Sequence, residues 1–543
     1  MDAGVDSSAA HRQRPLLSVD TRRVEASTEE PGEPLSPTAR LFQDIFIVAV
    51  FGFGTPIDFG PFRAGLEATL LQHPRFRSIQ VMDGPDEPRW VQTTVSLDDH
   101  LVIPDLDPTA ISANPDKVLE EYVASLSTLP MNLSRPLWEL HVLNFPTSES
   151  KSAVVFRIHH ALGDGTSLLS LVLACTRSAA DPKALPAMPA PPRRTGPIYS
   201  MPRPTRPAGA VASFAAWVSW CLLLAWHTVV DVARFVTSVM LVSDPRTVFT
   251  GGDGARLRGK RFVSRGLSFA DVKRVKNALG CVRRSHLLSA HWSAPFHMRC
   301  GGDQNSNSFF LRINFLQTDQ HYIRFDAQTV NDVLVGVTSA ALSRYHFRKL
   351  ATTDACLLRT ILAVNIRPTP GLPVSQKELA KMMENGKDNH VKWGNQVGYI
   401  VLPLYIAMHD DPLEYIRKAK KIVDRKKNSL EAIFTHVAAE AMTRYFGVKV
   451  SGDLFHRMEY NTTFAFSSLS GPVEQIEFYG HRVVYIAPSF YGNPTAVNLL
   501  WQSYGDTIRI VLAVDDAKIP DPHQLLDDFA ESLRTIREAT STA

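Results

Sequence analysis

A proline-rich segment near the middle of the chain constrains the fold most. Residues 181–209 read DPKALPAMPAPPRRTGPIYSMPRPTRPAG. Proline fixes φ and lacks a backbone donor, so a run this dense does not continue a helix or enter the interior of a sheet. We therefore expect two folded halves joined by an extended linker. The length of 543 residues allows this.

Composition shifts place the boundaries of these parts. We expect a disordered polar tail over 1–33, an N-terminal half over 34–185, a linker with an apolar helix over 186–258, and a C-terminal half over 259–543. Strand-like and helix-like segments recur along both halves. Helices are expected within 62–74, 166–179, 331–347 and 411–427, and strands within 89–95, 137–145, 152–158, 358–368, 462–472 and 508–516. The pair Thr166-Ser167 suits a helix N-cap.

An apolar stretch follows the linker. Residues 210–230 contain no Lys, Arg, Asp or Glu and are long enough to cross a bilayer as a helix. Trp217, Trp220 and Trp226 suit a membrane interface. A single crossing would separate the two halves, whereas an interfacial helix, or a re-entrant hairpin continuing through Arg234 to Val242, would not. A buried helix between the halves is the third alternative.

Charge and cysteine usage exclude several classes. The net charge of +4 is small for this length and no dense basic face stands out, so we expect no nucleic-acid partner. The five cysteines are widely spaced and form no CxxC pair, which indicates neither a disulfide framework nor a zinc site. The polar N-terminus lacks the apolar region of a secretory signal.

Two histidines mark the candidate site. The segment VVFRIHHALGDGTSLLSLVLA, residues 154–174, predicts a buried strand, a turn and a helix. A neutral imidazole there could take a proton from an alcohol, which could then attack a thioester carbonyl. From the residues alone, a polar turn or a satisfied core pair is the favoured interpretation, and a catalytic histidine is the alternative. No third ligand stands at a recognisable spacing, so we expect no metal.

The sequence HHALGDG, residues 159–165, matches the HHxxxDG pattern of the CoA-dependent acyltransferase superfamily, which includes chloramphenicol acetyltransferase. The wider chain resembles the plant wax ester synthase/diacylglycerol acyltransferase family. Six further motifs in order carry this resemblance: PLSPTARLF, SRPLWELHVL, NDVLVGVTSAALSRY, VNIRP, GNQVGYIVLPL and SSLSGP. The resemblance implies an α/β fold of two chloramphenicol-acetyltransferase-like halves, with mixed sheets flanked by helices and an active-site tunnel at their interface.

The resemblance also implies roles for the motif residues. His160 would be the general base, Asp164 would be structural and orienting, and His159 has no assigned role. Arg367 in VNIRP is the expected partner of Asp164.

Two further motifs are candidates for shaping the substrate site. They contribute the residues Asn331, Asp332, Pro136, Leu137 and Trp138. For the last three, packing at a strand end is the favoured interpretation over direct substrate contact.

The implied activity is transfer of a long-chain fatty acyl group from acyl-CoA to a long-chain alcohol, to diacylglycerol, or to both. Acyl-CoA would be a co-substrate, with no bound cofactor. The expected location is the endoplasmic reticulum membrane, with the plasma membrane as a second site and the active site facing the cytosol. The alternatives are an acyltransferase acting on a soluble alcohol or amine, and a non-catalytic protein that binds acyl-CoA or lipid.

One segment departs from the family pattern. Residues 282–328 interrupt two motifs expected to be nearly adjacent, and they show no clear period. The segment begins with Val, whose codons start GT, and ends with Gln, which CAG encodes. We therefore interpret it as a retained intron or gene-model error, with a lineage-specific loop as the alternative, and the mature transcript distinguishes the two. It is expected to pack poorly. We also expect no zinc cluster from the cysteines and histidines in it and just before it: Cys281, His286, His291, His297 and Cys300.

Overall fold

A computed structural model of the whole chain gives the fold. It describes residues 33–42, 44–82, 88–189, 210–251, 258–282, 329–350, 354–367 and 393–542. The expected tail, apart from Glu33, lies outside these ranges, and so does the segment 282–328, apart from Val282. The described residues contain no group of His, Cys, Asp and Glu that could hold a metal ion.

The N-terminal half is built on a seven-stranded mixed sheet. Its strands are, in spatial order, β5 (Leu101–Val102), β6 (Trp138–Leu143), β7 (Ser152–His159), β2 (Phe46–Phe53), β14 (His481–Tyr491), β13 (Ile476–Phe478) and β8 (Thr176–Ser178). One face packs against α2 (Phe59–Ala68), η2 (Leu70–Gln72), η3 (Pro74–Arg77) and α5 (Gly165–Ala174). The other face carries α4 (Pro115–Leu126), which buries Val123 and Leu126 against Val155 of β7. Both faces of β7 are therefore buried, as its continuous apolar sequence predicts.

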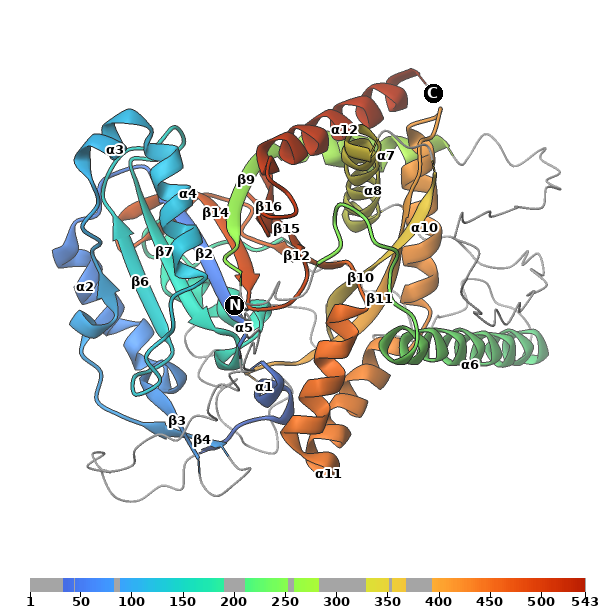
Figure 1. Cartoon of the computed structure of the whole chain (residues 1–543), viewed down its shortest axis with the longest axis horizontal. Helices are drawn as coiled ribbons and strands as arrows, with labels where there is room; N and C mark the ends of the chain where they lie inside the picture. The colour runs from blue at the N-terminus through green and yellow to red at the C-terminus, as the bar shows by residue number, and fades with distance from the viewer. Residues whose placement is uncertain are drawn as a thin grey trace, which may run out of the picture.

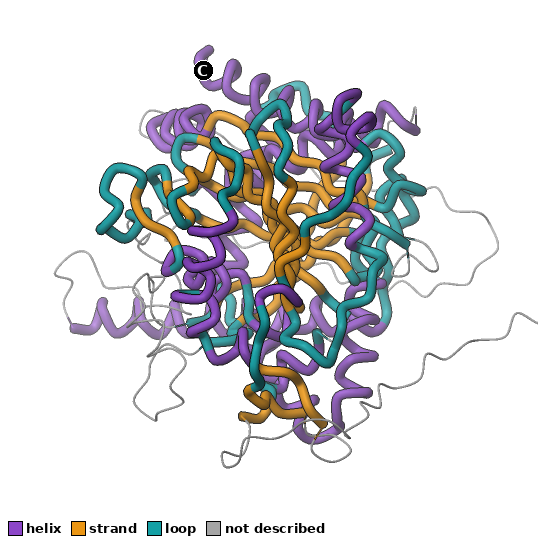
Figure 2. The backbone as a smooth tube through the Cα atoms, turned by 90° about the vertical axis from the view of Figure 1, so that its left-hand side faces the viewer, coloured by secondary structure: helices purple, strands orange, loops and turns teal. Residues whose placement is uncertain are grey.

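The C-terminal half is built on a six-stranded mixed sheet. Its strands are, in spatial order, β11 (Val397–Ile406), β10 (Cys356–Asn365), β12 (Phe464–Ser470), β15 (Val497–Tyr504), β16 (Thr507–Val514) and β9 (Arg261–Ser268). One core joins this sheet to α7 (Phe269–Val282), α8 (Val330–Leu350), α10 (Leu413–Lys427) and α12 (Pro522–Thr542). The long helix α11 (Glu431–Tyr460) also packs on β11, through contacts such as Tyr399 N–H to Thr435 Oγ1 at 2.8 Å. Figure 1 shows the halves side by side, and Figure 2 shows the strands gathered at the centre with helices around them. The expected α/β fold with two mixed sheets is confirmed.

Short elements complete the described chain. They are a small sheet of β1 (Glu33–Pro34), β4 (Pro88–Gln92) and β3 (Ser78–Met82), together with α1 (Pro37–Leu41), η4 (Leu97–Asp99), α3 (Pro108–Ala113) and η5 (His160–Leu162). The helix expected within 166–179 is shorter, since α5 ends at Ala174 and β8 follows. Its N-cap is Asp164, whose side chain accepts from Ser167 N–H, so the expectation of a Thr166-Ser167 cap was wrong.

The two halves are not strictly sequential, and this corrects the expected domain boundaries. Strands β13 and β14 belong to the range 259–543 but complete the N-terminal sheet. Strand β14 pairs antiparallel with β2, with Tyr491 opposite Phe46. Just beyond it, Gly492 has φ +100°, and a Cβ there would lie 1.8 Å from Asp44 O. Only glycine fits this approach, which fixes β14 beside the chain that leads into β2.

The apolar stretch after the linker forms one continuous helix, α6 (Ala210–Met240), which extends ten residues beyond the expected range. Residues 214–240 are long and apolar enough to cross a membrane, and only 6% of their most apolar window is buried. The helix projects from the body in Figure 1. The buried-helix interpretation and the re-entrant hairpin are therefore both wrong.

The second half of α6 is tied to the body by polar contacts. Asp231 Oδ1, which is fully buried, accepts from Arg425 Nη2 at 2.6 Å and lies 3.4 Å from Lys426 Nζ. Thr228 Oγ1 accepts from Leu430 N–H at 3.0 Å. These contacts hold α6 against α10 and the start of α11 and leave its first half exposed.

Candidate active site

The His-His pair lies where β7 leaves the sheet. His159 is the last residue of β7 and pairs with Phe46 of β2, and His160 begins the η5 turn. His159 Nδ1 accepts from Ala161 N–H at 3.2 Å, so this imidazole caps the turn. Its side chain is buried, and its ring packs edge-on against Phe46. The role that the sequence left unassigned is therefore structural in this geometry.

His160 is held by its backbone, and this leaves the imidazole available. Its N–H donates to Ile45 O at 2.9 Å, and its carbonyl accepts from Asn395 Nδ2 at 3.1 Å. The ring lies 4.3 Å from the ring of Phe42, centroid to centroid. Its Nδ1 is buried and has no hydrogen-bond partner among the described residues. Burial lowers the pKa of His160 below its ordinary value, opposed by the charge of Asp164, so the ring is a neutral base at pH 7.

The Asp164 carboxylate lies in a buried ion pair. Its Oδ2 accepts from Arg367 Nη1 at 2.7 Å and from Gln396 N–H at 3.0 Å, while Oδ1 caps α5 through Ser167 N–H at 2.9 Å. The side chains of Asp164 and Arg367 are 3% and 4% exposed. The two residues expected to pair thus lie in direct contact, and both carboxylate oxygens of Asp164 are engaged within the two loops.

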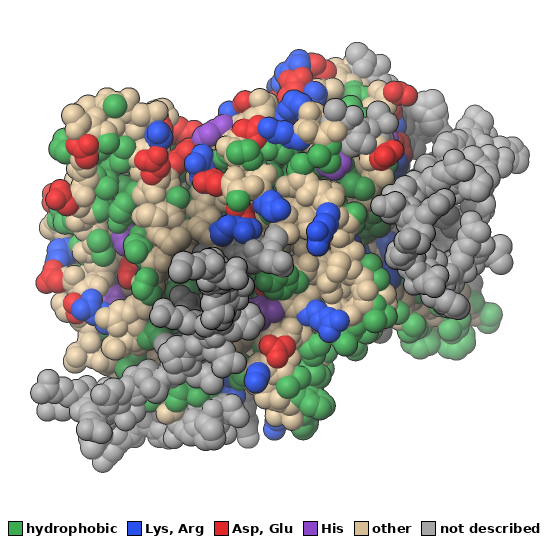
Figure 3. Space-filling view, viewed as in Figure 1, with side chains coloured by type: hydrophobic (Ala, Val, Ile, Leu, Met, Phe, Trp, Pro, Cys, Tyr) green, Lys and Arg blue, Asp and Glu red, His purple; other side chains and the backbone are tan. Residues whose placement is uncertain are grey.

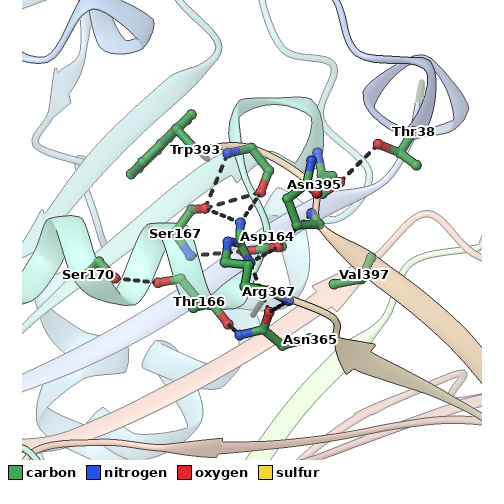
Figure 4. A network of polar contacts seen from close by, with 12 residues as sticks. Thr38, Asp164, Thr166, Ser167, Ser170, Asn365, Arg367, Trp393, Asn395 and Val397 are labelled. Atoms are coloured by element: carbon green, nitrogen blue, oxygen red, sulfur yellow. Dashed lines mark hydrogen bonds and ion pairs between the residues drawn. The ribbon is translucent and has the colours of Figure 1, made fainter. Parts of the chain in front are cut away.

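A second loop closes over the first. Residues 393–396, Trp-Gly-Asn-Gln, come from the C-terminal half just before β11. Trp393 Nε1 donates to Leu162 O at 2.8 Å, and Ser167 Oγ donates to Gly394 O at 3.1 Å. Arg367 Nη2 reaches Gly394 O as well, at 2.7 Å, so one network joins the two loops (Figure 4).

Sequence reasoning did not assign roles to Trp393, Asn395 or Gln396, and it expected Ser167 only as part of a helix N-cap. The first three lie at or beside the motif GNQVGYIVLPL, which the sequence supplied only as a family signature. A run of polar residues immediately before an apolar strand was the available signal.

Asn331 and Asp332 stand in the first turn of α8. Asp332 Oδ2 accepts from Thr329 N–H at 2.7 Å, and Thr329 Oγ1 accepts from Asp332 N–H at 3.3 Å, which is a capping box. Asp332 is fully buried and lies 3.8 Å from Lys420 Nζ. Its geometry is that of a helix anchor. Asn331 is exposed, and its Oδ1 accepts from Ser468 Oγ at 3.1 Å at the end of the C-terminal sheet.

Pro136, Leu137 and Trp138 lie in the core of the N-terminal half, which favours packing over direct substrate contact. Trp138 is fully buried, and its Nε1 donates to Phe76 O at 2.9 Å. Leu137 O accepts from His159 N–H at 2.9 Å. This segment therefore supports the strand from which the histidine loop departs.

A cavity of about 340 Å³ lies between the halves, lined by residues of α4, β2, β9, β14 and β16. Tyr485, Ser489 and Arg509 contribute to its wall. His160 and Asp164 do not line this cavity. The active-site tunnel expected at His160 therefore stays a prediction.

The Asp164–Arg367 pair gives a test of how the site is held. Arg367→Met leaves the Asp164 carboxylate buried without its cation, which should cost about 3–5 kcal/mol of unfolding free energy. Asp164→Asn should cost less, and the double variant less than the sum of the two, because each side chain acts through the other. Denaturant unfolding measures all three. The exposed pair Arg135–Asp99 supplies the control, since Arg135→Met should change stability by less than about 0.5 kcal/mol. Additive losses in the double variant would contradict the coupling.

Two family models match the chain. The wax ester synthase/diacylglycerol acyltransferase catalytic domain matches residues 52–282, and the WS/DGAT C-terminal domain matches residues 393–537. The first match contains the histidine loop, and the second contains the Trp393–Gln396 loop that closes over it. The first match also ends where the irregular segment 282–328 begins.

Individual proteins agree with the family models. Wax ester synthase/diacylglycerol acyltransferase 11 of Arabidopsis thaliana is 37% identical, with 96% of this chain and 98% of the relative covered. Wax ester synthase/diacylglycerol acyltransferase 5 of the same plant is 38% identical, with 98% of this chain and 99% of the relative covered. The solved wax ester synthase/diacylglycerol acyltransferase from Marinobacter aquaeolei VT8 shares the fold, with a TM-score of 0.54 at 16% identity over 94% of this chain and 100% of that one. This chain belongs to the wax ester synthase/diacylglycerol acyltransferase family.

Proposed function

We propose that this protein transfers a long-chain fatty acyl group from acyl-CoA to the hydroxyl of a long-chain alcohol, of diacylglycerol, or of both. The observation that carries the proposal is the position of the His160 imidazole, which lies on a loop that both halves secure and whose Nδ1 has no hydrogen-bond partner among the described residues. Family membership supports acyl transfer as the reaction. Acyl-CoA is a co-substrate in this proposal, and the chain needs no bound cofactor.

His160 acts as the general base. The imidazole accepts the hydroxyl proton as the alcohol oxygen attacks the thioester carbonyl carbon. The carbon–sulfur bond then breaks, and the CoA thiolate leaves and takes the proton back from the imidazolium. No acyl-enzyme forms, so one base and two substrate entrances suffice. Asp164 contributes by fixing the loop, since its carboxylate is engaged by Arg367.

Removal of the base tests the mechanism. His160→Ala should lower ester formation from palmitoyl-CoA and hexadecanol or diacylglycerol by about 10²–10⁴-fold, because the hydroxyl loses its proton acceptor. Labelled palmitoyl-CoA measures the rate, and circular dichroism checks the fold. His523→Ala, on the exposed start of α12, is the matched control and should retain full activity. Substantial turnover by a folded His160→Ala protein would rule out this base.

The lowered pKa of His160 sets the pH dependence. The base form persists below the ordinary histidine pKa of about 6.5 and is lost as the pH falls through the depressed value. We expect kcat/KM to stay level from pH 8 down to about 6.5 and to fall only at lower pH. Initial rates in buffers of constant ionic strength measure the profile. A half-maximal rate above pH 7 would contradict the assignment.

The exposed helix α6 favours a lipid acceptor over a soluble alcohol or amine. Its large apolar side chains at 211, 222, 229, 236 and 240 are exposed and recur at helical spacing. Trp217 and Trp226 are also exposed, and tryptophan is enriched at membrane interfaces. A non-catalytic lipid-binding role is disfavoured by the intact, well-held histidine loop.

We propose that α6 lies on the membrane rather than crossing it. Strand β8 precedes α6 and β9 follows it, and exchange of β14 joins their sheets into one body. One crossing would place these strands on opposite sides of the bilayer. The sequence of 190–209, with its four arginines, offers no second apolar segment. The proposed location is the endoplasmic reticulum membrane, and also the plasma membrane, with the active site facing the cytosol. Cell fractionation measures which membrane carries the protein, and protease protection measures which side of that membrane the active site faces.

A further inference from the structure

Helix α11 is a hairpin rather than a rod. A straight helix of its 30 residues would span about 45 Å. Both of its ends meet α6 instead: Leu430 N–H donates to Thr228 Oγ1, and Asn461 Nδ2 donates to Val239 O at 2.8 Å. Those two points on α6 are only about 16 Å apart along the helix. The chain therefore reverses inside α11.

The reversal is at Gly447, whose φ of +80° and ψ of 169° are not helical. A Cβ at Gly447 would meet nothing within 4 Å, so this backbone conformation, and not crowding, is what favours glycine there. Thr443 Oγ1 donates to Ser451 Oγ at 3.1 Å across the bend and ties the two arms together. The bend is thus the tip of a closed helical hairpin that projects from the lower edge of the molecule in Figure 1.

The tip presents aromatic and cationic side chains to solvent. Its sequence, residues 444–450, is RYFGVKV. Tyr445 is 77% exposed and Phe446 is 62% exposed, and Val450 is also exposed. Arg444 and Lys449 are exposed on either side of them. Exposure of two neighbouring aromatic residues is costly in water, because each carries a large apolar area.

The exposed apolar surface does not stop at the tip. Phe434, Val437 and Tyr460 are exposed on the arms of the hairpin, and α6 adds its own exposed row beside them. Figure 3 shows hydrophobic side chains gathered along the lower right of the molecule, over α6 and α11. The two elements are joined by packing of Val239 against Met458.

The same hairpin touches the active site from inside. Phe455, on its second arm, packs edge-on against Phe42 with ring centroids 5.8 Å apart. Phe42 in turn lies 4.3 Å from His160. Phe42 therefore connects the hairpin to the histidine loop, since its ring contacts both Phe455 and His160.

We propose that the α11 tip, Arg444–Val450, inserts into an anionic phospholipid leaflet as a second attachment point beside α6. The aromatic side chains enter the headgroup region, and Arg444 and Lys449 pair with lipid phosphates and acidic headgroups. A single helix can rotate about its axis, whereas two points fix the orientation of the body. The attachment thereby turns the Phe42 side of His160 toward the leaflet that holds the lipid acceptor. This inference rests on the proposed function in one respect, which is that the acyl acceptor is a lipid held in the leaflet.

Binding to vesicles tests the tip in the full-length chain without any substrate. Tyr445→Ser with Phe446→Ser should weaken partition at least about tenfold on both pure phosphatidylcholine and phosphatidylcholine–phosphatidylserine vesicles. Arg444→Gln with Lys449→Gln should weaken it roughly fivefold per cation on the serine-containing vesicles, with little effect on the neutral ones. Ile103→Ser is the matched control, because Ile103 is 61% exposed in the N-terminal half, and it should bind as the wild type does. Trp217→Ser with Trp226→Ser measures the α6 contribution.

Two results would overturn the proposal. One is unchanged vesicle binding by both tip variants. The other is a drop in molecular mass of the Tyr445/Phe446 variant in sedimentation without vesicles, which would identify the tip as a contact between copies of the chain. Failure of the proposed function looks different: the wild type would bind vesicles normally and form no ester from hexadecanol or diacylglycerol.

Discussion

The buried contact between Asp164 and Arg367 is the interaction on which the active site depends. The aspartate comes from the N-terminal half and caps α5, and the arginine follows β10 of the C-terminal half. Removing two charges from water is costly, and their attraction repays it only when further hydrogen bonds satisfy both groups. Gln396 and Ser167 supply those bonds, so the pair and the two loops are stable only together.

This arrangement explains how His160 can be reactive while its surroundings are rigid. The backbone of His160 is held from both sides, by Ile45 before β2 and by Asn395 before β11, whereas the ring makes mainly aromatic contact. Strand β14 adds a further tie, since it belongs to the C-terminal part of the sequence but lies in the N-terminal sheet. The halves thus meet at His160 and are tied together there and through β14. A general base gains from such positioning, because the proton must be transferred in one geometry.

The exposed apolar side of the molecule, which we propose faces lipid, is held in a different way. Helix α6 and the α11 hairpin are exposed and apolar, yet each is anchored by polar contacts such as Asp231 with Arg425. These polar contacts fix the position of the exposed apolar surface of α6 and the α11 hairpin relative to the two sheets. Under the proposed attachment, a substrate dissolved in a bilayer and a CoA ester dissolved in water would reach His160 from different directions.

The sequence by itself determined most of the local elements and pointed to the candidate site. Apolar runs predicted β7, α8 and β16, because these patterns lie in neighbouring residues. The family resemblance carried by the HHxxxDG and VNIRP motifs implied the role of His160 and the pairing of Asp164 with Arg367. The sequence did not predict the exchange of β14, the Trp393–Gln396 loop over the histidines, or the reversal at Gly447. Each of these depends on contacts between residues far apart in the chain, such as Phe46 with Tyr491. Only the tertiary structure could decide them, since strand partners and loop closure are selected by global packing and not by local propensity.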